Sequence, residues 1–252
     1  MTAGRLCPRT GLWLIGNSGG YGYHVAKTEY PPLSAAPRLS DQDPSGWGRY
    51  DVIGQTYYVA ESRTCAYAEV LSSFKRANGA ADPLVEDAAY YGMTIEEYLE
   101  EVAREWDERN FMGLGAIPAG WRLDRGMYSV ALPEHGWLVD VEHPDSIAAI
   151  EEMIEQQLGD FGVASLTTGV LRSEQREVTT FIAQTLEAVV LDDGSTPMGT
   201  HFGSKHGAAW CKGFWLNHPD AASSVIPLSP EPVLLTDPSL IRAANRFRIR
   251  VF

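Results

Sequence analysis

Hydrophobic and polar positions along the chain predict a mixture of short strands and amphipathic helices. Gln55 to Ala60 is rich in β-branched and aromatic residues, which favours a strand. A helix is expected from about Arg63, because Ser62 can cap it and apolar residues then recur at helical spacing. The apolar stripe of this helix passes through Ala66, Val70 and Phe74. Glu69 lies within or beside that stripe, where a carboxylate needs an explanation.

Similar patterns occur in the rest of the chain. Strands are predicted at Leu12–Ile15, Met127–Leu132, Trp137–Val141, the mostly apolar Ala208–Leu216, and Arg246–Phe252, whose alternation is the clearest. Residues 133–136 have the length of a hairpin connection. Helices are predicted from Thr94, where Glu97 completes a capping box, over Asp145–Leu158, and over Ser173–Val190 with a strand near Val189–Leu191. Residues 31–48, rich in Pro, Ser and Asp, predict a long loop.

Strands and helices alternate without a regular βαβ period, so the predicted class is α+β with a mixed or largely antiparallel sheet. The chain has no internal repeat and no convincing linker, and 252 residues with 44% hydrophobic content can form a full core. We therefore expect a single domain over residues 1–252.

Composition narrows the possible partners. A net charge of −13 would repel a phosphate backbone, which makes nucleic acid an unfavourable partner for this chain alone. The three cysteines are an odd number without paired spacing, which suits a reducing compartment. No segment approaches the roughly 20 apolar residues that cross a bilayer. These features predict a soluble, cytoplasmic protein without a membrane partner.

Several motifs fail when their spacing is considered. The glycine-rich segment 16–22 lacks the helix and glycines of a nucleotide-binding loop and indicates a plain turn. The spacing of His201, His206 and Cys211 matches no zinc pattern, so no metal site is expected. Glu69 remains, with two simple explanations: a salt bridge to a nearby Arg or Lys, or a helix rotated so that Glu69 contacts water.

The stretch around Glu69 resembles the RES family, which is named for its Arg, Glu and Ser. The resemblance rests, in order, on Gly48-Arg49-Tyr50-Asp51, Gly54, Tyr58-Val59-Ala60-Glu61-Ser62 and Ala66-Tyr67-Ala68-Glu69-Val70-Leu71. The Ser of the family comes late in the chain, before an apolar strand. Residues 201–207, His-Phe-Gly-Ser-Lys-His-Gly, are similar to that element and make Ser204 the candidate. The resemblance covers most of the chain, and a helical insertion is expected at about residues 76–125.

The resemblance implies an ADP-ribosyltransferase-like fold and an enzyme that consumes NAD by hydrolysis or phosphorolysis, acting as a toxin held in check by a protein antitoxin. NAD would be the substrate, and no separate cofactor would be needed. It implies that Glu69 stabilises charge on the ribose and that Arg49 grips the pyrophosphate. Tyr58 would orient nicotinamide, Ser204 would bind the ribose or carboxamide, and Lys205 would join them in substrate binding.

Two alternatives and one departure accompany this interpretation. The same fold could transfer ADP-ribose to a protein, or the chain could be a weakly catalytic binding protein that uses the acidic helix at residues 94–107. Each implied residue also has a structural alternative: Arg49 as a salt-bridge partner of Glu69, Tyr58 as sheet packing, Ser204 as a turn residue. Many RES proteins carry a further Arg in the first strand, where this chain has Leu14.

Overall fold

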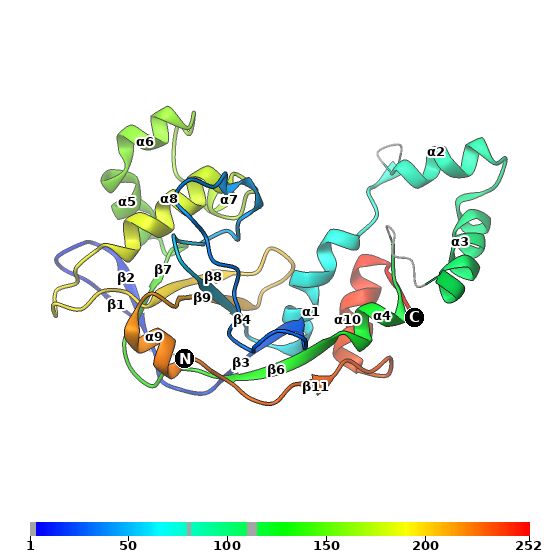
Figure 1. Ribbon diagram of the computed structural model, residues 1–252. Coiled ribbons are helices and arrows are strands. Elements are labelled where there is room, and N and C mark those ends of the chain that lie inside the picture. Colours follow the sequence, from blue (N-terminus) through cyan, green and yellow to red (C-terminus); the bar gives the residue numbers. More distant parts are fainter. Residues whose placement is uncertain (1–3, 80–81, 110–114) are drawn as a thin grey trace. The chain divides into compact units, whose positions relative to one another are not determined.

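The computed structural model describes residues 4–79, 82–109 and 115–252 (Figure 1). These residues divide into two compact units, each described here by itself. The first unit comprises the chain up to His24, Pro32–Glu61 and Ser129–Leu228, and the second comprises Val25–Pro31, Ser62–Tyr128 and Ser229–Phe252. Among the described residues, no helix combines the length and apolarity needed to cross a membrane.

The first unit is built on a sheet in which neighbouring strands follow the order β1-β2-β7-β8-β9-β4-β3. These strands are β1 (Gly4–Leu6), β2 (Trp13–Gly16), β3 (Tyr21–Lys27), β4 (Thr56–Ala60), β7 (Trp137–Asp140), β8 (Gly199–Gly203) and β9 (Trp210–Trp215), of which β3 belongs to the first unit up to His24. β7 and β8 are parallel. The pairs on either side of them are antiparallel. The predicted α+β class with a mixed, largely antiparallel sheet is confirmed.

The helices of the first unit are α5 (Pro144–Met153), α6 (Glu155–Asp160), α7 (Thr168–Leu171), α8 (Arg176–Glu187) and α9 (Pro219–Ser224), with a short 3-10 helix η1 (Pro44–Gly46) in the predicted long loop. In the view of Figure 1, α5, α6, α7 and α8 lie above the central strands, and α9 lies apart from them, below. α8 buries Val178, Ile182 and Leu186 at helical spacing. The helix predicted over Asp145–Leu158 breaks at Ile154, and the residues near Val189–Leu191 form no strand.

The second unit joins the middle of the chain to its end. Its elements are α1 (Arg63–Leu71), the 3-10 helix η2 (Ser72–Phe74), α2 (Pro83–Tyr90), α3 (Ile95–Arg109), β5 (Ala116–Ile117), α4 (Ala119–Leu123), β11 (Glu231–Pro232), α10 (Pro238–Phe247) and β12 (Arg250–Val251). α1 packs on α10, and β5 pairs in parallel with β12. Strand β6 (Arg125–Ala131) pairs with β10 (Ile226–Pro227) at its end and with β11 at its start.

Three predictions about these elements are wrong. Residues 246–252 are not one strand, because α10 continues to Phe247 and Arg248 takes a left-handed conformation with φ 57° before the short β12. Met127–Leu132 and Trp137–Val141 form strands but no hairpin, since β7 pairs instead with β2 and β8. The stripe of α1 is also shifted. This helix buries Cys65, Ala66, Tyr67, Ala68 and Leu71, whereas Val70 and Phe74 are half-buried.

Among the elements that the sequence did not predict are β3 and α2. β3 follows the glycine-rich turn, and α2 lies in a segment of small and polar residues. Within α2, Asp82 caps the first turn through Leu84 N–H and Pro83 takes the first helical position. The capping box of α3 is confirmed, because Glu97 accepts the backbone N–H of Thr94 at 2.8 Å and Thr94 Oγ1 accepts that of Glu97 at 3.2 Å.

Candidate functional site

Arg49 lies in the loop before β4 and is 8% exposed. Its guanidinium carbon stands 5.6 Å from the centre of the Phe202 ring, a cation–π distance. Within the described residues of the first unit, the buried Nε of Arg49 has no hydrogen-bond partner and no carboxylate forms an ion pair with the guanidinium. A buried cation in this state is costly unless an anion is supplied. The first unit thus presents an arginine poised for an anionic ligand.

A network of hydrogen bonds holds the loop on both sides of Arg49. Asp51 Oδ2 accepts the backbone N–H of Gly48 at 2.8 Å and Arg38 Nε–H at 2.7 Å. Tyr58 donates its hydroxyl to Asp51 Oδ1 at 2.8 Å and accepts the N–H of Tyr50 at 2.9 Å. A side chain at position 48 would begin 2.6 Å from Asp51 Oδ1, so the network requires glycine there. Arg49 is therefore presented from a fixed backbone.

The structure places Tyr58 as a support of this loop. Burial, and then the Asp51 carboxylate, raise the pKa of Tyr58 well above its usual value, so the phenol stays protonated. Because its hydroxyl is engaged with Asp51 and Tyr50, the ring is the part of Tyr58 that remains for other contacts. That ring meets Phe202 edge-on, with 6.3 Å between centroids.

Tyr50 anchors the same loop to the interior of the first unit. It is fully buried, donates its hydroxyl to the carbonyl of Leu171 at 3.0 Å, and accepts at its own carbonyl the indole N–H of Trp215 at 3.1 Å. Its ring lies 4.8 Å from that of Phe202. Phe202 therefore contacts Tyr50, Tyr58 and Arg49 together, a role that the sequence did not indicate.

Ser204 and Lys205 open the turn after β8. Ser204 is 2% exposed, and its Oγ accepts the backbone N–H of His206 at 3.1 Å. It follows Phe202 by two residues, which is the spacing of side chains on one side of a strand. Lys205 forms an ion pair with Glu174, which also pairs with Arg176 at the start of α8. The structure thus brings Arg49, Tyr58, Ser204 and Lys205 into one unit.

Glu69 belongs to the second unit. It is half-buried on α1, beside the buried Cys65, Ala66 and Ala68. Ser62 begins the helix by accepting the N–H of Cys65 at 3.2 Å, as predicted. Asp237 secures α1 by accepting Arg63 Nη2–H at 3.0 Å and the hydroxyl of Tyr67 at 2.9 Å.

Position 14 lies in the core of the first unit. Leu14 is fully buried on β2 and pairs with Val139 of β7. The position at which many RES proteins carry a further Arg is therefore filled here by an apolar side chain. Arg246, Arg248 and Arg250, which could replace the charge of that arginine, belong to the second unit.

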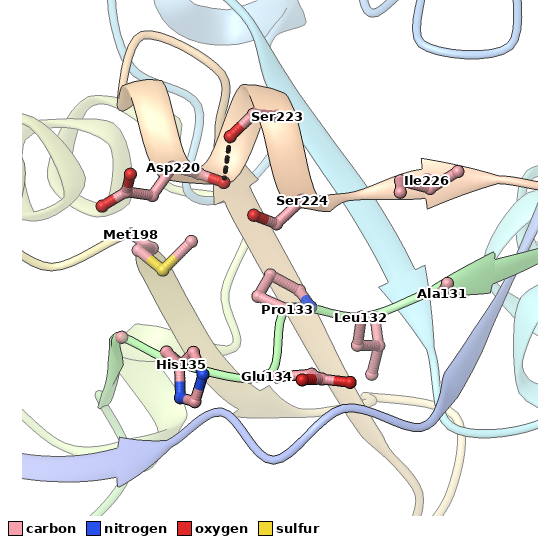
Figure 2. Close-up of a pocket in the computed structure, with 11 residues that line it drawn as sticks. Ala131, Leu132, Pro133, Glu134, His135, Met198, Asp220, Ser223, Ser224 and Ile226 are labelled. Atoms are coloured by element: carbon pink, nitrogen blue, oxygen red, sulfur yellow. Dashed lines mark hydrogen bonds between the residues drawn. The ribbon is translucent and has the colours of Figure 1, made fainter.

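A separate cavity of about 620 Å³ lies in the first unit (Figure 2). It is lined by residues 131–136, Met198, Asp220, Ser223, Ser224 and Ile226. None of the residues implied by the RES resemblance lines it. The cavity is therefore separate from the residues that the resemblance implies.

The chain was compared with family profiles, curated protein sequences and solved structures. No known family profile matches the chain, and no curated protein sequence matches it. One solved structure that aligns with it is the crystal structure of the M. tuberculosis MbcT–MbcA toxin–antitoxin complex, which covers 92% of this chain and 92% of that chain. The identity is 12% and the TM-score is 0.42, so we base the function on the residues themselves.

Proposed function

We propose that the protein breaks the bond between nicotinamide and ribose in NAD and acts as the toxin of a toxin–antitoxin pair. The observation that carries this proposal is Arg49, which is buried without an ion pair to any described carboxylate of the first unit and stands where the RES motif has its Arg. An anionic substrate supplies the missing partner.

The diphosphate of NAD suits this arginine. A guanidinium offers planar, paired N–H donors that match phosphate oxygens, and its charge does not titrate. Phe202 on one side and the Gly48–Asp51 turn on the other limit the positions that the guanidinium can take. Lys205 adds a second cation, and Ser204 contributes a hydroxyl group for the ribose or the carboxamide.

Glu69 would act on the sugar. Departure of nicotinamide leaves positive charge on the ribose, which a carboxylate stabilises more strongly in the transition state than in the ground state. The bond from the ribose carbon to nicotinamide breaks, and nicotinamide leaves with the electron pair. In hydrolysis a water oxygen bonds to that carbon and releases a proton, which Glu69 can accept. In phosphorolysis a phosphate oxygen takes the place of water.

The test is release of nicotinamide from NAD by the purified full chain, freed of any antitoxin. We expect Glu69→Gln to reduce kcat by about a hundredfold or more, since a charge acting in the transition state is removed. Arg49→Ala should raise KM. Glu86→Gln and Arg9→Ala, which change exposed side chains, serve as matched controls.

The products identify the acceptor. ADP-ribose indicates water, ADP-ribose 1-phosphate indicates phosphate, and labelled protein indicates transfer to a protein. Undiminished turnover by a folded Glu69→Gln variant would exclude the proposed mechanism. Absence of turnover in the wild type, with NAD supplied both with and without inorganic phosphate, would exclude the proposed function.

A further inference from the structure

Glu174 is a single carboxylate that faces several cations. It lies in the loop between α7 and α8, with a side chain 63% exposed, and it forms ion pairs with both Lys205 and Arg176. The hydrogen bond from Lys205, and the charges of Arg176, Lys205 and Arg49, lower the pKa of Glu174. Two cations thus pair with this carboxylate, and the charge of a third, Arg49, also acts on it.

The neighbouring arginine is already neutralised and does not add to this cluster. Arg172 binds Glu142 in a two-pronged arrangement, with Nε to Oε1 at 2.7 Å and Nη2 to Oε2 at 2.6 Å. A side chain at position 203 would begin 2.2 Å from Arg172 Nη2, so the glycine at the end of β8 leaves room for this pair. The cations that act on Glu174 are therefore Arg49, Arg176 and Lys205, without Arg172.

We infer that Arg49, Arg176 and Lys205 form a diphosphate subsite, and that Glu174 is its internal ligand, which the substrate displaces. This inference rests on the proposed function for the identity of the substrate. A diphosphate carries more negative charge than one carboxylate, and it can reach Arg49, which Glu174 does not contact by an ion pair. Glu174 sets the affinity of the subsite, because each binding event must first break its pairs with Lys205 and Arg176.

The direction of the effect follows from this competition. Glu174→Gln removes the competing charge and leaves Lys205 and Arg176 without their carboxylate partner. Because exposed ion pairs are worth up to about 1 kcal/mol, inorganic pyrophosphate should bind this variant about fivefold tighter than the wild type. The KM for NAD should fall by a similar factor, with kcat unchanged. Lys205→Met and Arg176→Met should weaken pyrophosphate binding.

The experiment is calorimetric titration of the full chain with inorganic pyrophosphate at low salt, for the wild type, Glu174→Gln and the control Glu177→Gln. Glu177 is exposed on the first turn of α8 and forms no ion pair in the described residues, so its variant should match the wild type. Repeating the titration in about 1 M salt, where the screening length is about 3 Å, should remove most of the difference.

The outcomes separate the inference from the proposed function. Equal or weaker pyrophosphate binding by Glu174→Gln would overturn the inference, because Glu174 would then only position Lys205 and Arg176. Absence of pyrophosphate binding by the wild type would also overturn it. Tighter binding by Glu174→Gln without any NAD turnover would support the subsite and reject the proposed reaction.

Discussion

At the scale of single residues, the arrangement around Arg49 depends on where each hydroxyl and carboxylate finds its partners. Tyr58 uses its hydroxyl twice, once for Asp51 and once for the backbone of Tyr50. Both contacts act on the turn that carries Arg49. We therefore propose that Tyr58 works as a positioning residue, which acts on the substrate through Arg49.

This role predicts a specific effect of Tyr58→Phe. The substitution keeps the ring but leaves the N–H of Tyr50 and one oxygen of Asp51 without a partner, which should lower the free energy of unfolding by about 1–3 kcal/mol. The KM for NAD should rise while kcat changes little, because Arg49 loses its fixed position. Denaturant unfolding and steady-state kinetics measure the two effects.

The control for this prediction is Tyr21→Phe, since Tyr21 is 59% exposed on β3. It should change neither stability nor KM. A Tyr58→Phe variant that is destabilised but has an unaltered KM would show that the hydroxyl serves stability alone.

Motifs could single out Arg49 and Glu69 as candidates because those residues belong to one short stretch with ordered spacing. The same reasoning could not predict Phe202, which contacts Arg49, or Glu174, on which the charge of Arg49 acts, since both lie more than a hundred positions from Arg49 in the chain. The role of Asp51 could have been predicted from the sequence. An acid two residues after the arginine, in a turn that begins with glycine, is a common acceptor for backbone N–H groups. Local spacing in the sequence reveals the first kind of residue. The second kind becomes visible only when the folded sheet brings distant parts of the chain together.

At the scale of elements, α1 and α10 are joined through one side chain. Asp237 caps α10 by accepting the N–H of Ser239 at 2.8 Å, and it also accepts hydrogen bonds from Arg63 and Tyr67 of α1. Its side chain is 8% exposed. The helix that carries Glu69 is therefore held by the residue that begins its neighbour.

We expect Asp237→Ala to lower the free energy of unfolding by about 3 kcal/mol, because the cap and the bonds to α1 are all lost. Asp237→Asn keeps a cap oxygen and should cost about half as much. Burial raises the pKa of Asp237, but hydrogen bonds from Arg63, Ser239 and Tyr67 lower it overall from 3.8. A depressed pKa stabilises the fold above pH 3.8, so the difference between wild type and Asp237→Asn should shrink as the pH falls below that value.

Chemical denaturation at several pH values measures these differences, with the exposed Asp87→Asn as the control in the same unit. Equal stability of Asp237→Ala and the wild type would mean that α1 is held by its apolar packing alone.

The alternation of residues 246–252 shows why an element can be mistaken at the level of sequence. Leu240, Ala243, Ala244 and Phe247 recur at helical spacing, and Asp237-Pro238 forms a start signal for a helix. Those signals precede the alternating arginines and determine the structure up to Phe247. The alternation of a few residues therefore predicted the structure less well than the start signal and spacing of the capped helix.

At the scale of the whole molecule, the predicted insertion separates into two parts. Gly115 donates its N–H to the carbonyl of Phe74 at 2.7 Å, so the chain leaves and returns at one place. Within this excursion, the described residues of α2 and α3 pack on each other. Residues after Gly115 behave differently: Trp121 is 5% exposed, and Arg122 donates to the carbonyls of Phe252 at 2.8 Å and Val233 at 2.9 Å. They belong to the packing of the second unit.

This division predicts that residues 77–113 can be replaced by a short Gly/Ser linker, since the ends of the segment already meet and closing a short loop costs little. The variant should unfold within a few degrees of the wild type and retain kcat/KM for NAD within about twofold. Extending the deletion through α4 should instead unfold the second unit, because it removes β5 and Trp121. Thermal unfolding and nicotinamide release measure both effects.

If α2 and α3 dock the proposed antitoxin, the shorter deletion abolishes complex formation while turnover persists. Loss of turnover in a folded variant would place these helices in the catalytic reaction.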